Sequence, residues 1–265
     1  MAENNKNASV NNSVLRACFI LDLFTPSKSE WSLKEIAQQC GIGVTTAMPL
    51  LRSLETVGYL ERDPNTKMYC LGMKFIEKSQ VKLNSLNIID CSKDLLRRMS
   101  EQYGVNTHLA VLDRGEIVYL SRYAAMVHSL IPSYVGKRLP VYCTALGKAI
   151  LANMDASEAG RVLAMQDYCQ YTPKTVQDAD ALRVQLEQVR ANGYAVDDEE
   201  HQMGSYCLAA PVFASTGAVC AAISASIVKT DERMSIVPAL TDAIRECAEQ
   251  ISKNIGYRGF SDARV

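Results

Sequence analysis

Residues 31–71 constrain the fold more than any other stretch, because they contain the start and stop signals of two short helices. Ser32 and Glu35 have the spacing of a capping box, so a helix is expected to begin at Ser32. Gly41 can adopt the left-handed conformation that ends a helix. After a short turn, apolar residues recur at helical spacing and predict a second helix with one buried face: Ala47, Leu50, Leu51 and Leu54.

A hairpin is predicted directly after the second helix, which Gly58 ends. Residues 59–62 and 67–71 flank Asp-Pro-Asn-Thr at 63–66, which is turn chemistry between two short strands. Two helices followed by a hairpin are the layout of a winged helix-turn-helix, whose second helix presents side chains to base edges in the major groove of DNA. The alternative is a helical hairpin that only packs or dimerises.

The candidate DNA contacts lie on the polar face of the second helix and on the hairpin. They are Thr45, Thr46, Met48, Arg52, Ser53, Arg62 and Lys67. Residues 1–78 hold nine Lys or Arg against eight Asp or Glu, a net charge of +1. Since a single copy would attract phosphate only weakly, this charge favours a symmetric dimer that reads two half-sites.

Composition excludes several other classes of protein. The chain has 265 residues, 48% hydrophobic and 22% charged, with a net charge of −1, as in ordinary proteins of one or two domains. No apolar run is long enough to span a membrane, and the Asn-rich start does not resemble a signal peptide, so a cytoplasmic location is expected. Nine scattered cysteines without a C-x-x-C pair, and only three histidines, predict reduced thiols, no metal site and no cofactor.

The chain is predicted to divide into five segments. These are a disordered N-terminus (1–12), the winged helix-turn-helix domain (13–72) with a first helix capped by Ser13, a linker helix (73–86), a larger domain (87–257) and a C-terminal tail (258–265). In the larger domain, strands are expected at 106–112, 116–122, 129–134, 205–213 and 218–228, and helices at 88–103, 145–153, 156–164, 179–192 and 236–255. This order predicts an α+β domain with an antiparallel sheet and helices on its faces.

Three groups of residues in the larger domain could form a ligand site. Thr144 is placed to cap a helix and to leave the N–H groups of Ala145 and Leu146 available to an anion, although an ordinary capped helix is an equal alternative. Ser224 and Ser226 lie on one face of a strand among small residues. The third group is the acidic run at 197–201, expected to be a solvated turn in which only one acid need face inward, together with Cys207.

Taken together, residues 13 to about 257 resemble the IclR family of bacterial transcriptional regulators. The resemblance is carried by an ordered set of segments: 54–60 (LETVGYL), 69–72 (YCLG), 144–149 (TALGKA), 197–201 (DDEEH), 204–211 (GSYCLAAP) and 222–226 (AISAS). It implies a winged-helix domain, a linker helix and a GAF-like effector domain, assembled as dimers or pairs of dimers on double-stranded promoter DNA. It also implies a pocket for a small organic effector, often a carboxylate, at the positions of Ala145, Leu146, Asp197, Cys207, Ser224 and Ser226.

The resulting hypothesis is a regulator, not an enzyme, in which effector binding is passed through residues 73–86 to the spacing of paired DNA-binding domains. Pro49 stands where the family commonly has a polar reader, so base contacts would fall to the neighbouring side chains. Two alternatives remain. One is a domain that only dimerises, without an effector; the other is an enzyme with Cys207 as nucleophile and His201 as base.

Overall fold

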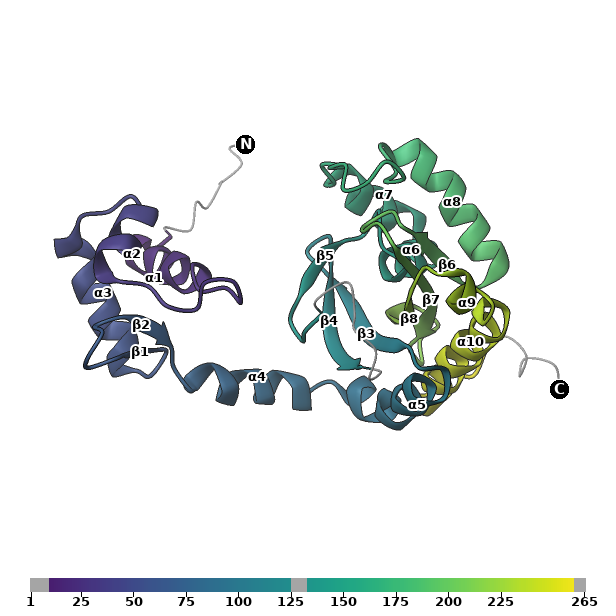
Figure 1. The fold of residues 1–265 in the computed structure, drawn as a ribbon, viewed down its shortest axis with the longest axis horizontal. Coiled ribbons are helices and arrows are strands. Elements are labelled where there is room, and N and C mark those ends of the chain that lie inside the picture. Colours follow the sequence, from purple (N-terminus) through teal and green to yellow (C-terminus); the bar gives the residue numbers. More distant parts are fainter. Residues whose placement is uncertain (1–9, 125–132, 260–265) are drawn as a thin grey trace, which may run out of the picture. The chain divides into compact units, whose positions relative to one another are not determined.

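The computed structural model describes residues 10–124 and 133–259 (Figure 1). The chain divides into two compact units, one ending at Ser85 and the other beginning at Leu86. We call them the N-terminal unit and the C-terminal unit. Each has its own hydrophobic core, and each is described by itself.

The N-terminal unit is a winged helix-turn-helix followed by one further helix, which lies within the predicted linker segment. Its elements are α1 (Asn12–Asp22), α2 (Leu33–Gln39), α3 (Val44–Thr56), β1 (Leu60–Arg62), β2 (Tyr69–Leu71) and α4 (Lys74–Asn84). The two strands pair as an antiparallel hairpin. Its core is made of apolar side chains from α1 to β2: Ile20, Trp31, Ile36, Leu51, Leu54, Leu60 and Tyr69.

Local capping accounts for how the first two helices begin. The predicted capping box of α2 is confirmed: Ser32 Oγ accepts the Glu35 N–H at 3.3 Å, and Glu35 Oε2 accepts the Ser32 N–H at 2.8 Å. The predicted cap of α1 is wrong, because the Asn11 side chain, and not Ser13, accepts the first free N–H groups. Residues 11 and 12 of the segment predicted to be disordered therefore belong to the start of a helix, while residues 1–9 lie outside the described residues.

Pro49 lies in the interior of α3, beyond the first turn. A proline there cannot donate the backbone hydrogen bond that a helix interior normally forms, and its ring crowds the carbonyl one turn earlier. The helix nevertheless continues to Thr56, with Ala47, Leu51 and Leu54 buried. Pro49 itself is exposed.

The C-terminal unit is built on a six-stranded antiparallel sheet in the order β5-β4-β3-β8-β7-β6. Its strands are β3 (Asn106–Asp113), β4 (Glu116–Tyr123), β5 (Arg138–Pro140), β6 (Ala195–Asp198), β7 (Ser205–Phe213) and β8 (Val219–Val228). Its helices are α5 (Asn87–Tyr103), α6 (Ala145–Leu151), α7 (Ala156–Ala164), α8 (Ala179–Asn192), α9 (Asp231–Met234) and α10 (Val237–Asn254). The predicted α+β class is confirmed.

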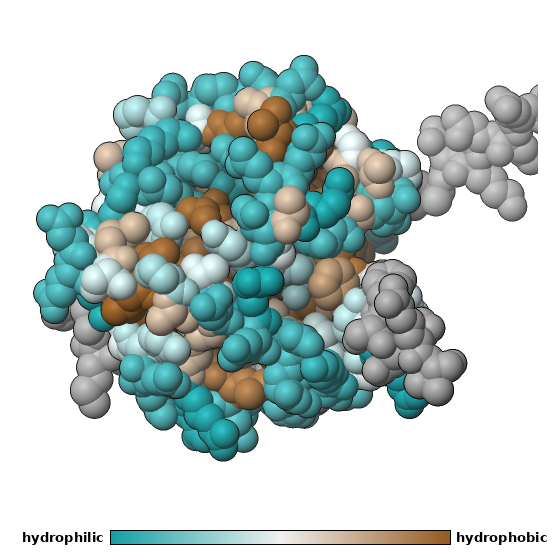
Figure 2. Space-filling view, turned by 90° about the vertical axis from the view of Figure 1, so that its right-hand side faces the viewer, coloured by the Kyte–Doolittle hydropathy of each residue, from teal (hydrophilic) through white to brown (hydrophobic). Residues whose placement is uncertain are grey.

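Helices cover both faces of this sheet, and each face has a core of its own. The helices α5 and α10 pack on one face, and α6, α7 and α8 pack on the other (Figure 1). The outer surface seen in Figure 2 is mostly hydrophilic, with small apolar patches separated from one another. The site described below lies on the face that α6 and α8 cover.

Three short elements of the C-terminal unit were not predicted from the sequence: β5, β6 and α9. Of the strand expected at 129–134, residues 129–132 lie outside the described residues, and Ser133 and Tyr134 are not part of a strand. The start of the acidic run is also not a turn, because Asp197 and Asp198 end the edge strand β6. A four-residue strand has too few alternating positions to produce a clear period-two pattern.

Candidate functional site

A cluster of buried polar side chains lies on one face of the central strands. The sheet register pairs Asp197 of β6 with Cys207 of β7, and Cys207 with Ser226 of β8. Ser224, two residues earlier on the same face, pairs with His108 of β3. Residues that are up to 118 positions apart in the sequence thus form two adjacent rows across the sheet.

His108 occupies the centre of this cluster, and the sequence patterns had not singled it out. Its Nδ1 lies 3.2 Å from Ser224 Oγ, its Nε2 lies 2.9 Å from Ser133 Oγ, and its ring stacks on Tyr119 with centroids 4.7 Å apart. Burial lowers the pKa of His108 to about 3. The imidazole is therefore neutral at physiological pH, so one ring nitrogen donates a hydrogen bond and the other accepts one.

The thiol of Cys207 is held in a protonated state. Its Sγ donates to Ser226 Oγ at 3.2 Å. Burial raises the pKa of Cys207 to about 12, and the nearby charge of Asp197 acts in the same direction. The side chain therefore offers a small polar contact and not a thiolate nucleophile.

The acidic run sends two carboxyl groups inward, one more than the single inward-facing acid that the sequence pattern required. Asp197 is 3% exposed and Glu200 is 7% exposed. Glu200 pairs with the buried Lys148 of α6, whose Nζ lies 2.5 Å from Glu200 Oε1. Asp198 and Glu199 instead form ion pairs with lysines near the surface.

Asp197 is a buried acid whose charge is only partly compensated. Burial raises its pKa to about 7, against the opposing effects of Lys148 and of the backbone N–H of Glu200. Its Oδ1 accepts the N–H groups of Glu200 at 2.8 Å and His201 at 3.4 Å. Asp197 thus shapes the loop that follows β6, a role in addition to the ligand contact that the family resemblance implies.

Two buried polar atoms of this loop have no hydrogen-bond partner among the described residues: Glu200 Oε2 and His201 Nδ1. The His201 ring packs on Tyr171 with centroids 5.0 Å apart. Since buried polar atoms are nearly always hydrogen-bonded, these two atoms mark a place where a ligand or water can bind. The sequence signal was present in the run DDEEH, but it did not indicate which residues turn inward.

The start of α6 completes the arrangement. Thr144 Oγ1 accepts the Gly147 N–H at 3.2 Å, as expected of the cap, and Ala145 and Leu146 are both buried in the core that also contains Cys207. A Cβ at Gly147 would lie 2.1 Å from the carbonyl oxygen of Val141, so only glycine allows α6 to approach this segment so closely. The close approach fixes where α6 begins.

In the N-terminal unit, all seven predicted DNA contacts are exposed. Arg52 and the two threonines at positions 45 and 46 lie on the outer side of α3, opposite its buried apolar residues. On the hairpin, Arg62 Nε donates to the carbonyl of Lys67 at 3.3 Å, and its guanidinium lies over the Tyr69 ring. The hairpin side chains are therefore positioned by contacts within the hairpin.

The fold and the site together define a class of protein: a winged-helix DNA-binding unit joined to a unit of the kind that senses small molecules. Family models match both parts. The IclR helix-turn-helix domain matches residues 13–64, and the C-terminal domain of the bacterial transcriptional regulator IclR matches residues 80–253. The chain belongs to the IclR family of bacterial transcriptional regulators.

Individual relatives agree with this assignment over nearly the whole chain. The transcriptional regulator XynR of Escherichia coli is 33% identical over 92% of this chain and 97% of its own length. BhcR of Paracoccus denitrificans is 32% identical over 94% of this chain and 89% of its own. The crystal structure of Thermotoga maritima IclR is 32% identical, with a TM-score of 0.77 over 93% of this chain and 99% of that one.

The described part of the chain contains neither a helix that could span a membrane nor a group of side chains that could hold a metal ion. None of its helices is both long enough and apolar enough to cross a membrane. Among residues 10–124 and 133–259, no three His, Cys, Asp or Glu side chains gather in a way that would hold a metal ion. All nine cysteines are free thiols.

Proposed function

We propose that this transcriptional regulator binds promoter DNA under the control of a small organic acid that occupies the cluster around His108 and Ser224. The observation that carries the proposal is the set of buried polar groups gathered from β3, β6, β7 and β8 on one face of the sheet. Proteins seldom bury so many polar groups together without a functional reason, since each costs free energy unless it is paired. The proposed ligand contacts are Ala145, Leu146, Asp197, Cys207, Ser224 and Ser226.

The acid character of the ligand is supported by the donors in the cluster. Ser224 and Ser226 carry hydroxyl groups that can donate to a carboxylate. When the Nδ1–H of neutral His108 donates to Ser224 Oγ, the hydroxyl proton of Ser224 is left to donate to a ligand. An IclR homologue from Microbacterium hydrocarbonoxydans, 24% identical to this chain with a TM-score of 0.82, was crystallised with 4-hydroxybenzoate. A carboxylate with a small apolar or aromatic body agrees with the apolar wall that Leu146 would provide.

A ligand screen read by thermal shift tests the effector site. A small carboxylate that binds should raise the melting temperature, corresponding to roughly 2.7 kcal/mol at a hundred times its dissociation constant. Ser224→Ala should weaken that binding about tenfold because one hydrogen bond to the acid is lost. Ser215→Ala, in an exposed loop, is the matched control and should bind as the wild type does.

The regulatory half of the proposal needs a separate measurement. Fluorescence anisotropy with the DNA upstream of the protein's own gene should show tighter binding than to random DNA, and a bound acid should change that affinity. If no carboxylate shifts the melting temperature and none changes the affinity for DNA, the protein only dimerises on DNA and the effector proposal is wrong.

The DNA contacts proposed are Thr45, Thr46, Met48, Arg52 and Ser53 on α3, with Arg62 and Lys67 on the hairpin. Arg52 has the longest polar reach of the α3 group, whereas the Ser53 hydroxyl already donates to the Pro49 carbonyl at 2.9 Å. We therefore assign base reading mainly to Arg52 and the two threonines, and phosphate contacts to the hairpin.

The proposed location of this regulator is the cytoplasm, because a bacterial protein that binds promoters acts where the chromosome lies.

We propose that the protein is a homodimer or a pair of homodimers, as its resemblance to the IclR family implies. The net charge of only +1 over residues 1–78 supports two DNA-binding units acting together. Residues 73–86, which contain α4, are proposed as the linker that carries the effector's influence between the two units. We assign no catalytic role to Cys207, because its raised pKa disfavours the thiolate that an enzyme would need.

A further inference from the structure

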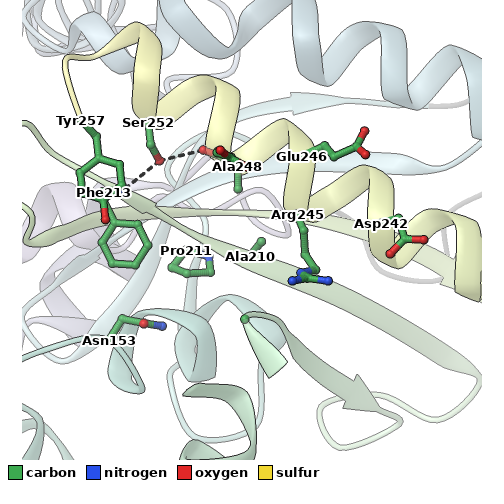
Figure 3. A pocket seen from close by; sticks show the side chains of 12 residues that line it. Asn153, Ala210, Pro211, Phe213, Asp242, Arg245, Glu246, Ala248, Ser252 and Tyr257 are labelled. Carbon is green, nitrogen blue, oxygen red and sulfur yellow. Dashed lines mark hydrogen bonds between the residues drawn. The ribbon is translucent and has the colours of Figure 1, made fainter. Parts of the chain in front are cut away.

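A second hollow lies away from this cluster, at the open edge of the sheet. The edge strand β6 pairs with β7 only as far as Ala209, so the last residues of β7 have no strand on that side, although β8 pairs with them on the other. There, between β7, α10 and the end of α6, lies a cleft of about 470 Å³ (Figure 3). This volume falls at the lower end of the range of about 300–1,000 Å³ found for small-molecule sites.

The backbone of this edge is poorly suited to pairing with another strand. Pro211 has no N–H to donate. The N–H of Phe213 already donates to Ser252 Oγ at 3.0 Å, and Ser252 in turn donates to the carbonyl of Ala248 on α10 (Figure 3). The N–H of Pro211 is absent and that of Phe213 is occupied, so neither can donate a hydrogen bond to an added strand. Strand addition is therefore disfavoured, and the cleft suits a small molecule.

Side chains of mixed charge face the cleft. The guanidinium of Arg245 extends from α10 toward β7, and its Nε lies 3.6 Å from where a Cβ of Gly193 would be (Figure 3). Arg245 has no hydrogen bond or ion pair with any described residue. Asp242, one turn earlier on α10, extends to the same side (Figure 3), and Glu246 and Glu249 of α10 also line the cleft.

The opposite wall supplies one more acceptor and an apolar surface. Asn153, just after α6, donates its Nδ2 to the Ala149 carbonyl at 2.9 Å, which leaves its Oδ1 available to a ligand. The rings of Phe213 and Tyr257 stack with centroids 5.3 Å apart beside Pro211. Part of the cleft is therefore apolar, and the rest presents one cation, one amide oxygen and the carboxylates of Asp242, Glu246 and Glu249. Glu249 is already paired with Lys253.

We propose that this cleft is a second ligand site, for an α-amino acid with an apolar side chain. The ligand's carboxylate pairs with the planar guanidinium of Arg245, its ammonium group is accepted by Asp242 and Asn153, and its side chain packs on Pro211 and the two aromatic rings. A simple anion would be repelled by the carboxylate of Asp242, and a simple cation would be repelled by the guanidinium of Arg245. A zwitterion offers an oppositely charged partner to Arg245 and to Asp242.

Isothermal titration calorimetry of the full-length protein with L-leucine and L-phenylalanine tests the site. Binding of at least one is expected, and Arg245→Gln should weaken it at least about tenfold because a charge-assisted pair is lost. Arg161→Gln, which removes the same charge from an exposed position on α7 outside the cleft, is the matched control and should bind normally. Ser224→Ala should also bind normally, since it lies in the other cluster.

Two leucine analogues test the zwitterion itself: 4-methylpentanoate lacks the ammonium group, and 3-methylbutylamine lacks the carboxylate. Each should bind at least about tenfold more weakly than leucine when both are measured with the Ser224→Ala protein, in which the first cluster binds carboxylates poorly. Absence of binding by both amino acids at millimolar concentration overturns the proposal. So does equal binding of either analogue, or an affinity that Ser224→Ala abolishes and Arg245→Gln leaves unchanged.

Discussion

Asp197 links burial to pH dependence at the scale of a single residue. Its ordinary pKa is 3.8, and burial in the folded chain raises it to about 7. Between these values the folded protein binds the proton that the unfolded chain has lost, so this residue makes stability fall as pH rises from about 4 to about 7. The fall approaches its limit of about 1.4 kcal/mol per pH unit only in the middle of that window.

Asp197→Asn removes this titration while keeping an oxygen that can accept the Glu200 N–H. We expect the variant to gain stability relative to the wild type as pH rises from 5 to 8, measured as the difference between their urea-unfolding free energies. Asp167→Asn, which changes an exposed carboxyl group, should show no such trend. Parallel curves for wild type and Asp197→Asn would show that Asp197 does not titrate in this range.

At the scale of an element, Pro49 makes α3 less stable than its length suggests. A proline in a helix interior costs up to about 3 kcal/mol, and Pro49 is exposed, so replacing it leaves no cavity. Pro49→Ala should therefore stabilise the N-terminal unit by about 1–3 kcal/mol. Trp31 is the only tryptophan of the chain and lies in the core of this unit, so its fluorescence reports the unfolding of this unit.

The control for Pro49→Ala is Glu55→Ala, an exposed position of the same helix that carries an ordinary backbone N–H. Its effect should stay within about 0.5 kcal/mol. A Pro49→Ala protein whose urea midpoint is unchanged or lower would mean that the proline is already accommodated, or is needed to set the course of the helix.

At the scale of the whole molecule, apolar side chains on α1 and α4 support a contact with a second copy. On α1, Leu15 and Phe19 lie one turn apart and are 39% and 58% exposed, and at the start of α4 Met73 and Ile76 lie one turn apart and are 68% and 62% exposed. Exposed apolar groups gathered on neighbouring helix turns commonly mark interaction surfaces. We expect these two helices to contribute to the proposed dimer.

Phe19→Glu should shift the protein from dimer toward monomer in sedimentation velocity, because a charge in an apolar contact loses its hydration without gaining a partner. Weaker binding to promoter DNA should accompany that shift. Val184→Glu introduces the same charge on α8 at a side chain that is 59% exposed, close to the 58% of Phe19, and it should leave both properties unchanged. A Phe19→Glu protein that sediments like the wild type would exclude α1 from the interface.

Local signals explain why much of the fold was predictable. The capping box of Ser32 and Glu35, the stops at Gly58 and Gly104 and the long strands β7 and β8 depend on residues close together in the chain, and the structure has them as predicted. The cap of α1 was predicted wrongly and β6 was not predicted, because the local patterns are weak at both places. Asn11 and Ser13 are both good helix caps, and a strand of four residues hardly shows its period.

The sequence by itself determined the winged helix-turn-helix, the α+β class and the family, because these rest on short-range patterns and on ordered segments. Only the tertiary structure decided that His108 meets Ser224, that Lys148 and Glu200 form a buried pair, and that β7 ends beside an open cleft. Each of these depends on strand register and helix packing between distant residues. A one-residue shift in the register of one strand would turn its polar side chains to the other face of the sheet, and the pairing of strands that are distant in the sequence decides that register.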